Sequence, residues 1–174
     1  MQQWFLEQLA MYAAYHRDKR NQATHHVGVP LIVYALLVAL TQIPLPEFSD
    51  LRMTGATLIL VILLAFYLMN VPVIGAFAMV IYGILYIVAV EVGQLSANTV
   101  WTTFAACFVG GWIIQFIGHI FEGRRPAFLD NAVQIFMAPP FLIAEVLFSF
   151  GLQRELQRQI DLQMRKYIPD RAEA

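Results

Sequence analysis

Histidine is the side chain of this sequence best suited to holding a metal ion. The chain contains four, His16, His25, His26 and His119. Three neighbours lie at helical spacing from them: Asn21 four residues before His25, Gln115 four before His119, and Glu122 three after His119. Each such pair would share one helix face. Imidazole binds iron, zinc and copper, and histidines beside a carboxylate suit non-haem iron. Spacing alone leaves an alternative, that these histidines are only solvated or hydrogen-bonded.

The elements that must position these histidines are strongly apolar. The chain is 59% hydrophobic and 13% charged, whereas soluble domains carry roughly 25% charged residues. Residues 53–90 contain no charge, and neither do residues 92–121. A charge at the centre of a spanning helix costs about 2.5–3.5 kcal/mol, so such runs indicate a lipid environment. No basic cluster is large enough to follow a nucleic-acid backbone, and the single cysteine, Cys107, excludes a disulfide framework.

Four apolar runs predict four spanning helices, at residues 27–43, 53–69, 73–90 and 98–121. A span needs about 20 residues, so Asn70-Val71-Pro72 is interpreted as a turn between the second and third runs. Residues 1–21 and 152–167 have the periodicity of amphipathic helices. Residues 130–151 are apolar but contain Pro139-Pro140, which predicts a broken apolar hairpin. The predicted fold is an all-α polytopic membrane helical bundle, formed by a single integral membrane domain over residues 1–174.

Four spans would gather the basic residues on one side of the membrane. Ten of the eleven Lys and Arg residues fall on the side of the termini, and only Arg52 on the other. The positive-inside rule makes the first side cytoplasmic. All four histidines lie at this same side. Both termini and the candidate site are therefore predicted to be cytoplasmic, at the inner membrane of a bacterium or the endoplasmic reticulum membrane of a eukaryote.

Two sequence motifs carry a family resemblance. The first is Tyr15-His16-x4-Asn21-x3-His25-x4-Pro30. The second is Gln115-Phe116-Ile117-Gly118-His119-x2-Glu122-x3-Pro126-Ala127, followed by Ala138-Pro139 and Glu145. From about Tyr15 to Phe148 the chain resembles the iron(II)-dependent 2-hydroxy fatty acid dioxygenases, a family of small multi-span membrane proteins.

This resemblance implies a reaction and a set of site residues. The reaction is fatty acid α-oxidation, in which a 2-hydroxy fatty acid and O2 give a fatty acid one carbon shorter and CO2. The family's histidine positions fall on His16, His25 and His119, which would bind Fe(II). His26 is a possible additional ligand. The acidic positions fall on Glu122 and Glu145, expected to be catalytic, and a carboxylate such as Glu145 in an apolar segment is expensive unless it is functional or paired.

The polar residues around the predicted ligands have supporting roles in this hypothesis. Asn21 and Gln115 are expected to orient the histidines. Arg124 and Arg125 follow His119 and could contact the substrate carboxylate, because Arg suits bidentate pairing; they could instead only anchor the topology. A 2-hydroxy acid can chelate a metal through its hydroxyl and carboxylate, so the protein must supply about three ligands and a route for the acyl chain.

Two other classes of protein compete with the dioxygenase. One is a b-type haem protein, although its histidines usually lie inside spans. The other is a non-catalytic transporter or scaffold that uses His119 and Glu122 as a proton relay. Against this second alternative, the second and third apolar runs hold no ionisable group at mid-bilayer.

Overall fold

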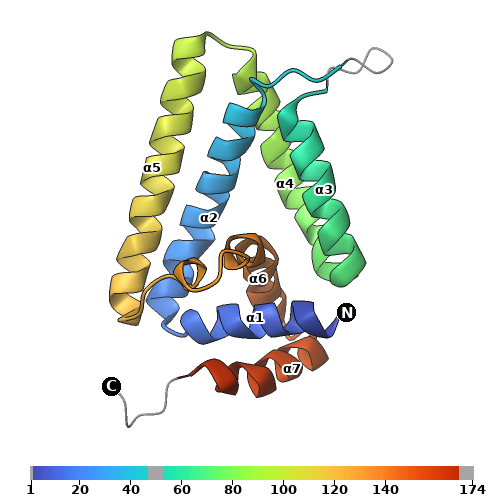
Figure 1. Cartoon of the computed structure of the whole chain (residues 1–174), viewed down its shortest axis with the longest axis vertical. Helices are drawn as coiled ribbons and strands as arrows, with labels where there is room; N and C mark the ends of the chain where they lie inside the picture. Colours follow the sequence, from blue (N-terminus) through green and yellow to red (C-terminus); the bar gives the residue numbers. More distant parts are fainter. Residues whose placement is uncertain (1, 47–52, 169–174) are drawn as a thin grey trace. The chain divides into compact units, whose positions relative to one another are not determined.

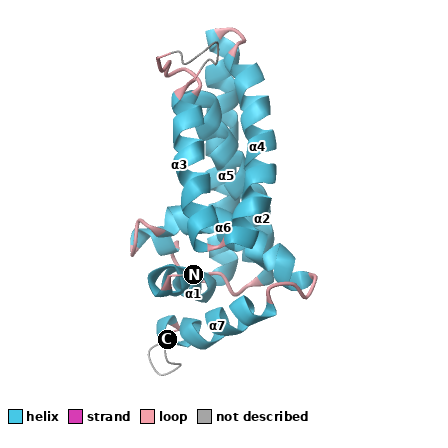
Figure 2. Ribbon diagram, turned by 90° about the vertical axis from the view of Figure 1, so that its right-hand side faces the viewer, coloured by secondary structure: helices cyan, strands magenta, loops and turns pink. Residues whose placement is uncertain are grey.

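The computed structural model describes residues 2–46 and 53–168, and all of its regular elements are helices. In chain order these are α1 (Gln3–Tyr15), α2 (Lys19–Leu40), α3 (Gly55–Asn70), α4 (Pro72–Gly93), α5 (Ala97–Glu122), η1 (Ala127–Leu129), α6 (Gln134–Ser149), α7 (Arg154–Met164) and η2 (Arg165–Tyr167) (Figures 1 and 2). The all-α prediction is confirmed. Arg52, in the predicted external loop, lies outside the described residues. The chain divides into two compact units: unit 1 contains residues 1–26 and 115–174, and unit 2 contains residues 27–114.

Three of the described helices are long and apolar enough to cross a membrane: α2, α4 and α5. A fourth candidate is α6 taken together with α7 as a single broken span, bent by 119°. The helix α3 has 16 residues, fewer than the ~20 that a perpendicular span needs. These helices identify an integral membrane protein.

Unit 2 has the surface that lipid requires. The predicted turn is present, because α3 ends at Asn70 and α4 begins at Pro72, where a proline loses no helical hydrogen bond. The Thr57 and Tyr86 hydroxyls, 2.7 Å apart, connect α3 to α4. Large aliphatic side chains point outward, with Ile62 57% exposed and Ile87 63% exposed. Such faces are stable in hydrocarbon and costly in water.

Unit 1 begins differently from the sequence prediction. One amphipathic helix over residues 1–21 was expected, but α1 ends at Tyr15 and α2 begins at Lys19. The cause is Asp18, whose carboxylate accepts a hydrogen bond from the Arg20 backbone N–H at 2.8 Å and so caps α2. The first span therefore begins earlier than residue 27, and His25 lies on α2. The helix α1 packs against α6 and α7.

The broken apolar hairpin predicted within residues 130–151 needs a correction. The segment has a short turn and then one helix, α6, which contains both Pro139 and Pro140. The break comes later, where Gly151 adopts a positive φ of 72° and its N–H donates to the Phe148 carbonyl. The Leu152 N–H donates to the Leu147 carbonyl, which completes a Schellman motif. The chain bends after α6 and not at the prolines.

Candidate metal centre

Three histidines from three helices meet inside unit 1. His16 follows the last residue of α1, His25 lies in the second turn of α2, and His119 lies in the last turn of α5. They can place one ring nitrogen each within 4.8 Å of one another. The side chains are buried, with 4%, 2% and 7% of their surface exposed. Among the described residues, these three form the group that could hold a metal ion.

Hydrogen bonds to backbone carbonyls determine which nitrogens face the centre. His16 Nδ1 donates to the Tyr12 carbonyl at 2.8 Å, and His25 Nδ1 donates to the Asn21 carbonyl at 2.9 Å. Because a carbonyl only accepts, Nδ1 carries the proton in both rings and each neutral ring has a bare lone pair on Nε2. These two Nε2 atoms lie 3.2 Å apart. A cation bound by both nitrogens would relieve the repulsion between two lone pairs at this distance, so the donor set fits a metal ion.

The His16 ring is held neutral and in a fixed plane. Burial, and then the repulsion that His25 would exert on a second positive charge, keep the pKa of His16 well below its usual range. The Tyr12 ring stacks on it, with centroids 4.0 Å apart and planes 10° apart. The neutral ring is the form that binds metals. His119 Nδ1 is buried without a hydrogen-bond partner in the described structure, so this ring has a nitrogen to offer as a ligand.

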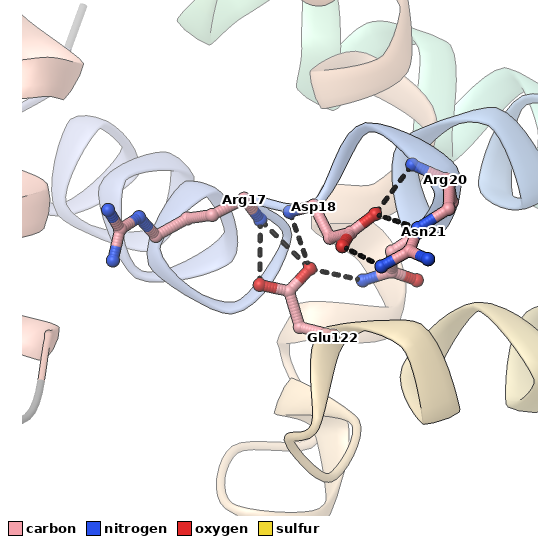
Figure 3. A network of polar contacts seen from close by, with 5 residues as sticks. All are labelled: Arg17, Asp18, Arg20, Asn21 and Glu122. Atoms are coloured by element: carbon pink, nitrogen blue, oxygen red, sulfur yellow. Dashed lines mark hydrogen bonds and ion pairs between the residues drawn. The ribbon is translucent and has the colours of Figure 1, made fainter.

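Glu122 fastens the corner between α1 and α2. Its carboxylate accepts hydrogen bonds from the Arg17 backbone N–H, the Asp18 backbone N–H and the Asn21 side-chain amide, all between 2.9 and 3.0 Å (Figure 3). A carboxylate at a helix N-terminus also stabilises the helix dipole. Glu122 lies three residues after His119 on α5, and the corner carries His16 and His25. One carboxylate therefore connects the elements that supply all three histidines.

Gly118 allows α5 to approach α2 closely at the same level. A Cβ atom there would collide with the Thr24 hydroxyl and lie 2.5 Å from Asn21 Oδ1. Asn21 itself is fully buried. His119 follows Gly118 in the sequence, and His25 follows Thr24. A larger distance between α5 and α2 at Gly118 would therefore move these two histidines apart.

The other predicted site residues take varied positions. His26 and Glu145 pair with each other, Nε2 to Oε2, at 3.4 Å, and neither belongs to the histidine group. Gln115 is half-buried one turn before His119. Arg124 donates to the Ala14 and Tyr167 carbonyls and lies over the Tyr15 ring, and exposed Arg125 pairs with Asp130. The structure thus commits both arginines to contacts within the protein.

A cavity of about 580 Å³ within unit 1 adjoins the histidine group. His16 and Glu145 line it, together with two cations, Arg17 and Lys19, that the sequence reasoning missed. Their only signal was the basic run between Tyr15 and Asn21, which has the form of an ordinary solvated turn. The predicted surface helix, α7, also contributes to the wall of this cavity.

Comparison with known proteins agrees with the geometry. A family model described as 2-hydroxy-palmitic acid dioxygenase Mpo1-like matches residues 2–150. The chain is 31% identical over 159 residues to the 2-hydroxy-palmitic acid dioxygenase MPO1 of Saccharomyces cerevisiae, covering 88% of this chain and 86% of the yeast protein. No solved structure matches the chain. The region matched by the family model contains His16, His25 and His119.

Proposed function

The chain belongs to the Mpo1-like 2-hydroxy-palmitic acid dioxygenase family and is an oxidoreductase, and we propose that it shortens 2-hydroxy fatty acids by one carbon in an Fe(II)-dependent reaction. The observation that carries the proposal is the buried pair of Nε2 atoms of His16 and His25, 3.2 Å apart, with His119 beside them. Three neutral imidazoles suit ferrous iron. They leave coordination positions for a substrate with two oxygen donors.

The proposed reaction balances without an external reductant. A 2-hydroxy acid and O2 give the acid one carbon shorter, CO2 and water. The bond between the carboxyl carbon and the hydroxyl-bearing carbon breaks, and the latter becomes the new carboxyl carbon. The substrate loses four electrons, and O2 takes up all four. A bound ferrous ion would supply the one-electron chemistry with O2 that no amino-acid side chain performs.

The side chains of unit 1 have separate roles in this proposal. His16, His25 and His119 hold the metal. Glu122 is a positioning residue, because its oxygens already accept hydrogen bonds from the α1–α2 corner. Glu145 lines the cavity beside His16 and is paired with His26. We therefore assign Glu145 the role of proton acceptor or donor in the reaction, with His26 as its hydrogen-bonding partner. Arg124 connects the Ala14 and Tyr167 carbonyls, and Arg125 pairs locally with Asp130, so we assign structural roles to both.

The competing functions receive less support from the geometry. The three imidazole rings have centroids 4.5–5.2 Å apart, which leaves no room for a porphyrin between them, so a b-type haem is disfavoured. A proton relay through His119 and Glu122 is disfavoured because backbone and amide N–H groups already occupy the Glu122 carboxylate. Metal content and an absorption spectrum of the purified protein distinguish all three functions.

We also propose that the site faces the cytoplasm, on the basis of the ten-to-one bias of basic residues. Cysteine labels at Gln42 and Ser96 should react from the external side, and a label at Arg154 from the cytoplasmic side. If either Gln42 or Ser96 reacts from the same side as Arg154, this orientation is wrong.

Purified protein reloaded with Fe(II) under anaerobic conditions tests the reaction itself. On addition of O2, 2-hydroxyhexadecanoate should give pentadecanoate and CO2 in equal amounts. The 3-hydroxy isomer should not be consumed, because its hydroxyl and carboxylate are one carbon further apart. Turnover that survives strict removal of iron, or that proceeds without O2, would contradict the proposal.

A further inference from the structure

The cavity beside His16 has a polar side and a mixed side, which carries both apolar and polar residues. The corner between α1 and α2 contributes His16, Arg17 and Lys19 to its lining. The helices α6 and α7 contribute equal numbers of apolar and polar residues: Phe141, Phe148, Ile160 and Met164, and Glu145, Ser149, Gln157 and Asp161. Phe141 and Ile160 are buried, whereas Phe148 and Met164 are half-buried. Five of its thirteen lining residues are apolar and eight are polar or charged, so the cavity suits a small molecule that has both a polar and an apolar part.

The two cations on the polar side are available to a ligand. Figure 3 shows the Arg17 side chain extending away from Glu122, to which Arg17 is joined only by its backbone N–H. Within residues 2–46 and 53–168, neither the Arg17 nor the Lys19 side chain has a hydrogen-bond or ion-pair partner. The neighbouring Arg20 differs, because its guanidinium is bonded to Asp18 at 2.8 Å. Arg17 and Lys19 can therefore accept an anionic group without losing an existing partner.

The acidic residues of the cavity lie on its other walls. Glu145, on α6, is paired with His26. Asp161 is exposed and lines the cavity from α7, the C-terminal helix. An anion would be repelled from these side chains and attracted to the corner. The charges therefore orient an amphiphile with its anionic end beside His16.

We propose that this cavity is the fatty acid site, in which Arg17 and Lys19 bind the substrate carboxylate and the apolar side chains of α6 and α7 contact the acyl chain. The inference rests on the proposed function for the identity of the acid, and it deepens that function by assigning the carboxylate to residues other than Arg124 and Arg125. With its carboxylate at Arg17 and Lys19, the acid has its second carbon, which carries the hydroxyl, next to His16. The long chain extends over Phe141 and Phe148.

Binding to the metal-free protein tests this assignment without relying on turnover. Calorimetric titration at fixed detergent concentration compares 2-hydroxyhexadecanoate with its primary amide, which has the same shape and no charge. Wild type should bind the acid more tightly than the amide. Arg17→Gln and Lys19→Gln should each raise the Kd for the acid roughly fivefold to tenfold and leave the Kd for the amide unchanged. Asp161→Asn should lower the Kd for the acid.

Arg20→Gln is the matched control, because Arg20 is a nearby exposed cation that does not line the cavity. It should leave both Kd values unchanged. An acid that binds no tighter than the amide, a flat response to Arg17→Gln and Lys19→Gln, or an equal loss in Arg20→Gln would overturn the assignment. If Arg17→Gln, Lys19→Gln and Asp161→Asn change the Kd for the acid as expected while the iron-loaded protein leaves the acid intact, the site assignment is supported and the proposed reaction is wrong. If the acid is consumed while these three variants leave its Kd unchanged, the reaction is supported and the site assignment is wrong.

Discussion

Unit 2 exposes apolar side chains, whereas unit 1 buries polar ones. In unit 2, Ile62 and Ile87 are more than half exposed, as suits a surface against lipid tails. In unit 1, His16, Asn21 and His25 are almost completely buried. Unit 1 also holds all four histidines and ten of the eleven Lys and Arg residues.

The two units therefore differ in the substitutions that they tolerate. A lipid-facing side chain in unit 2 needs only to be apolar, because hydrocarbon surrounds it before and after the exchange. A buried polar atom in unit 1 needs a particular partner at hydrogen-bond distance, because an unmade bond costs about 1–3 kcal/mol. Substitutions at buried polar positions of unit 1 should therefore cost more than substitutions on the lipid face of unit 2.

The metal ligands should give the largest effect. His16→Ala and His25→Ala each remove an Nε2 atom of the pair 3.2 Å apart, so iron binding and turnover should fall by more than the roughly 100-fold that loss of an outer partner can cost. His26→Ala is the control on the same helix, and it should keep its iron because His26 is outside the group. Full iron occupancy in His25→Ala would contradict the claim that His25 binds the metal and His26 does not.

Loss of the Glu122 carboxylate should give the second-largest effect. Glu122→Gln keeps the shape but replaces one acceptor oxygen by an NH2 donor, which faces the Arg17 backbone N–H in either orientation of the amide because that N–H bonds both carboxylate oxygens. Iron affinity should fall roughly tenfold to 100-fold, as for other partners that orient ligands. Glu91→Gln, in α4 of unit 2, makes the same exchange at an exposed position and should change nothing. A catalytic acid would instead lose turnover with iron affinity intact, so measuring both quantities separates the two roles of Glu122.

Two glycines of α5, Gly118 and Gly110, should respond differently to the same substitution. Gly118→Ala forces a methyl group against Thr24 and Asn21, and overpacking of this kind costs about 1–3 kcal/mol. Gly110→Ala meets open space and should be neutral or slightly stabilising. Thermal unfolding and iron titration of both variants provide the measurement. Equal behaviour of the two would mean that the close approach of α5 to α2 does not position the ligands.

The lipid face should give the smallest effect. Ile62→Ala, on the exposed side of α3, should change stability by less than about 0.5 kcal/mol. Leu9→Ala, at a fully buried position of α1, should cost about 2–5 kcal/mol because it leaves a cavity. Unfolding in the same detergent compares the two variants. A larger loss for Ile62→Ala would show that this face of unit 2 packs against protein.

Much of the fold was predictable because charge-free runs and prolines determine spanning helices. The turn between α3 and α4 was placed correctly from Asn70-Val71-Pro72. The start of α2 was missed because the prediction followed the apolar run and overlooked Asp18, a good helix cap in a polar stretch. The bend after α6 was missed because Pro139-Pro140 was taken as the break in place of Gly151, whose positive φ ends the helix. In both cases a local capping signal was present in the sequence.

The candidate site was predictable in part. Topology placed all four histidines on one side, the family resemblance selected His16, His25 and His119 among them, and the structure brings these three together. The partners of Glu122 were not predictable, because two of them are backbone N–H groups that meet α5 only in the folded protein. The cations of the cavity were hidden for the same reason. Arg17 and Arg20 are equivalent in sequence terms, and only the structure shows that Arg20 already has a partner.

X-ray absorption at the iron edge tests the central claim most directly, because it counts imidazole rings around the metal. Fe(II) bound to the wild-type protein should show the scattering of three imidazoles, from His16, His25 and His119. The His119→Ala protein, loaded at high iron concentration, should show two. Three imidazoles in His119→Ala, or a wild-type shell made of oxygen ligands alone, would contradict the assignment of the metal to this group.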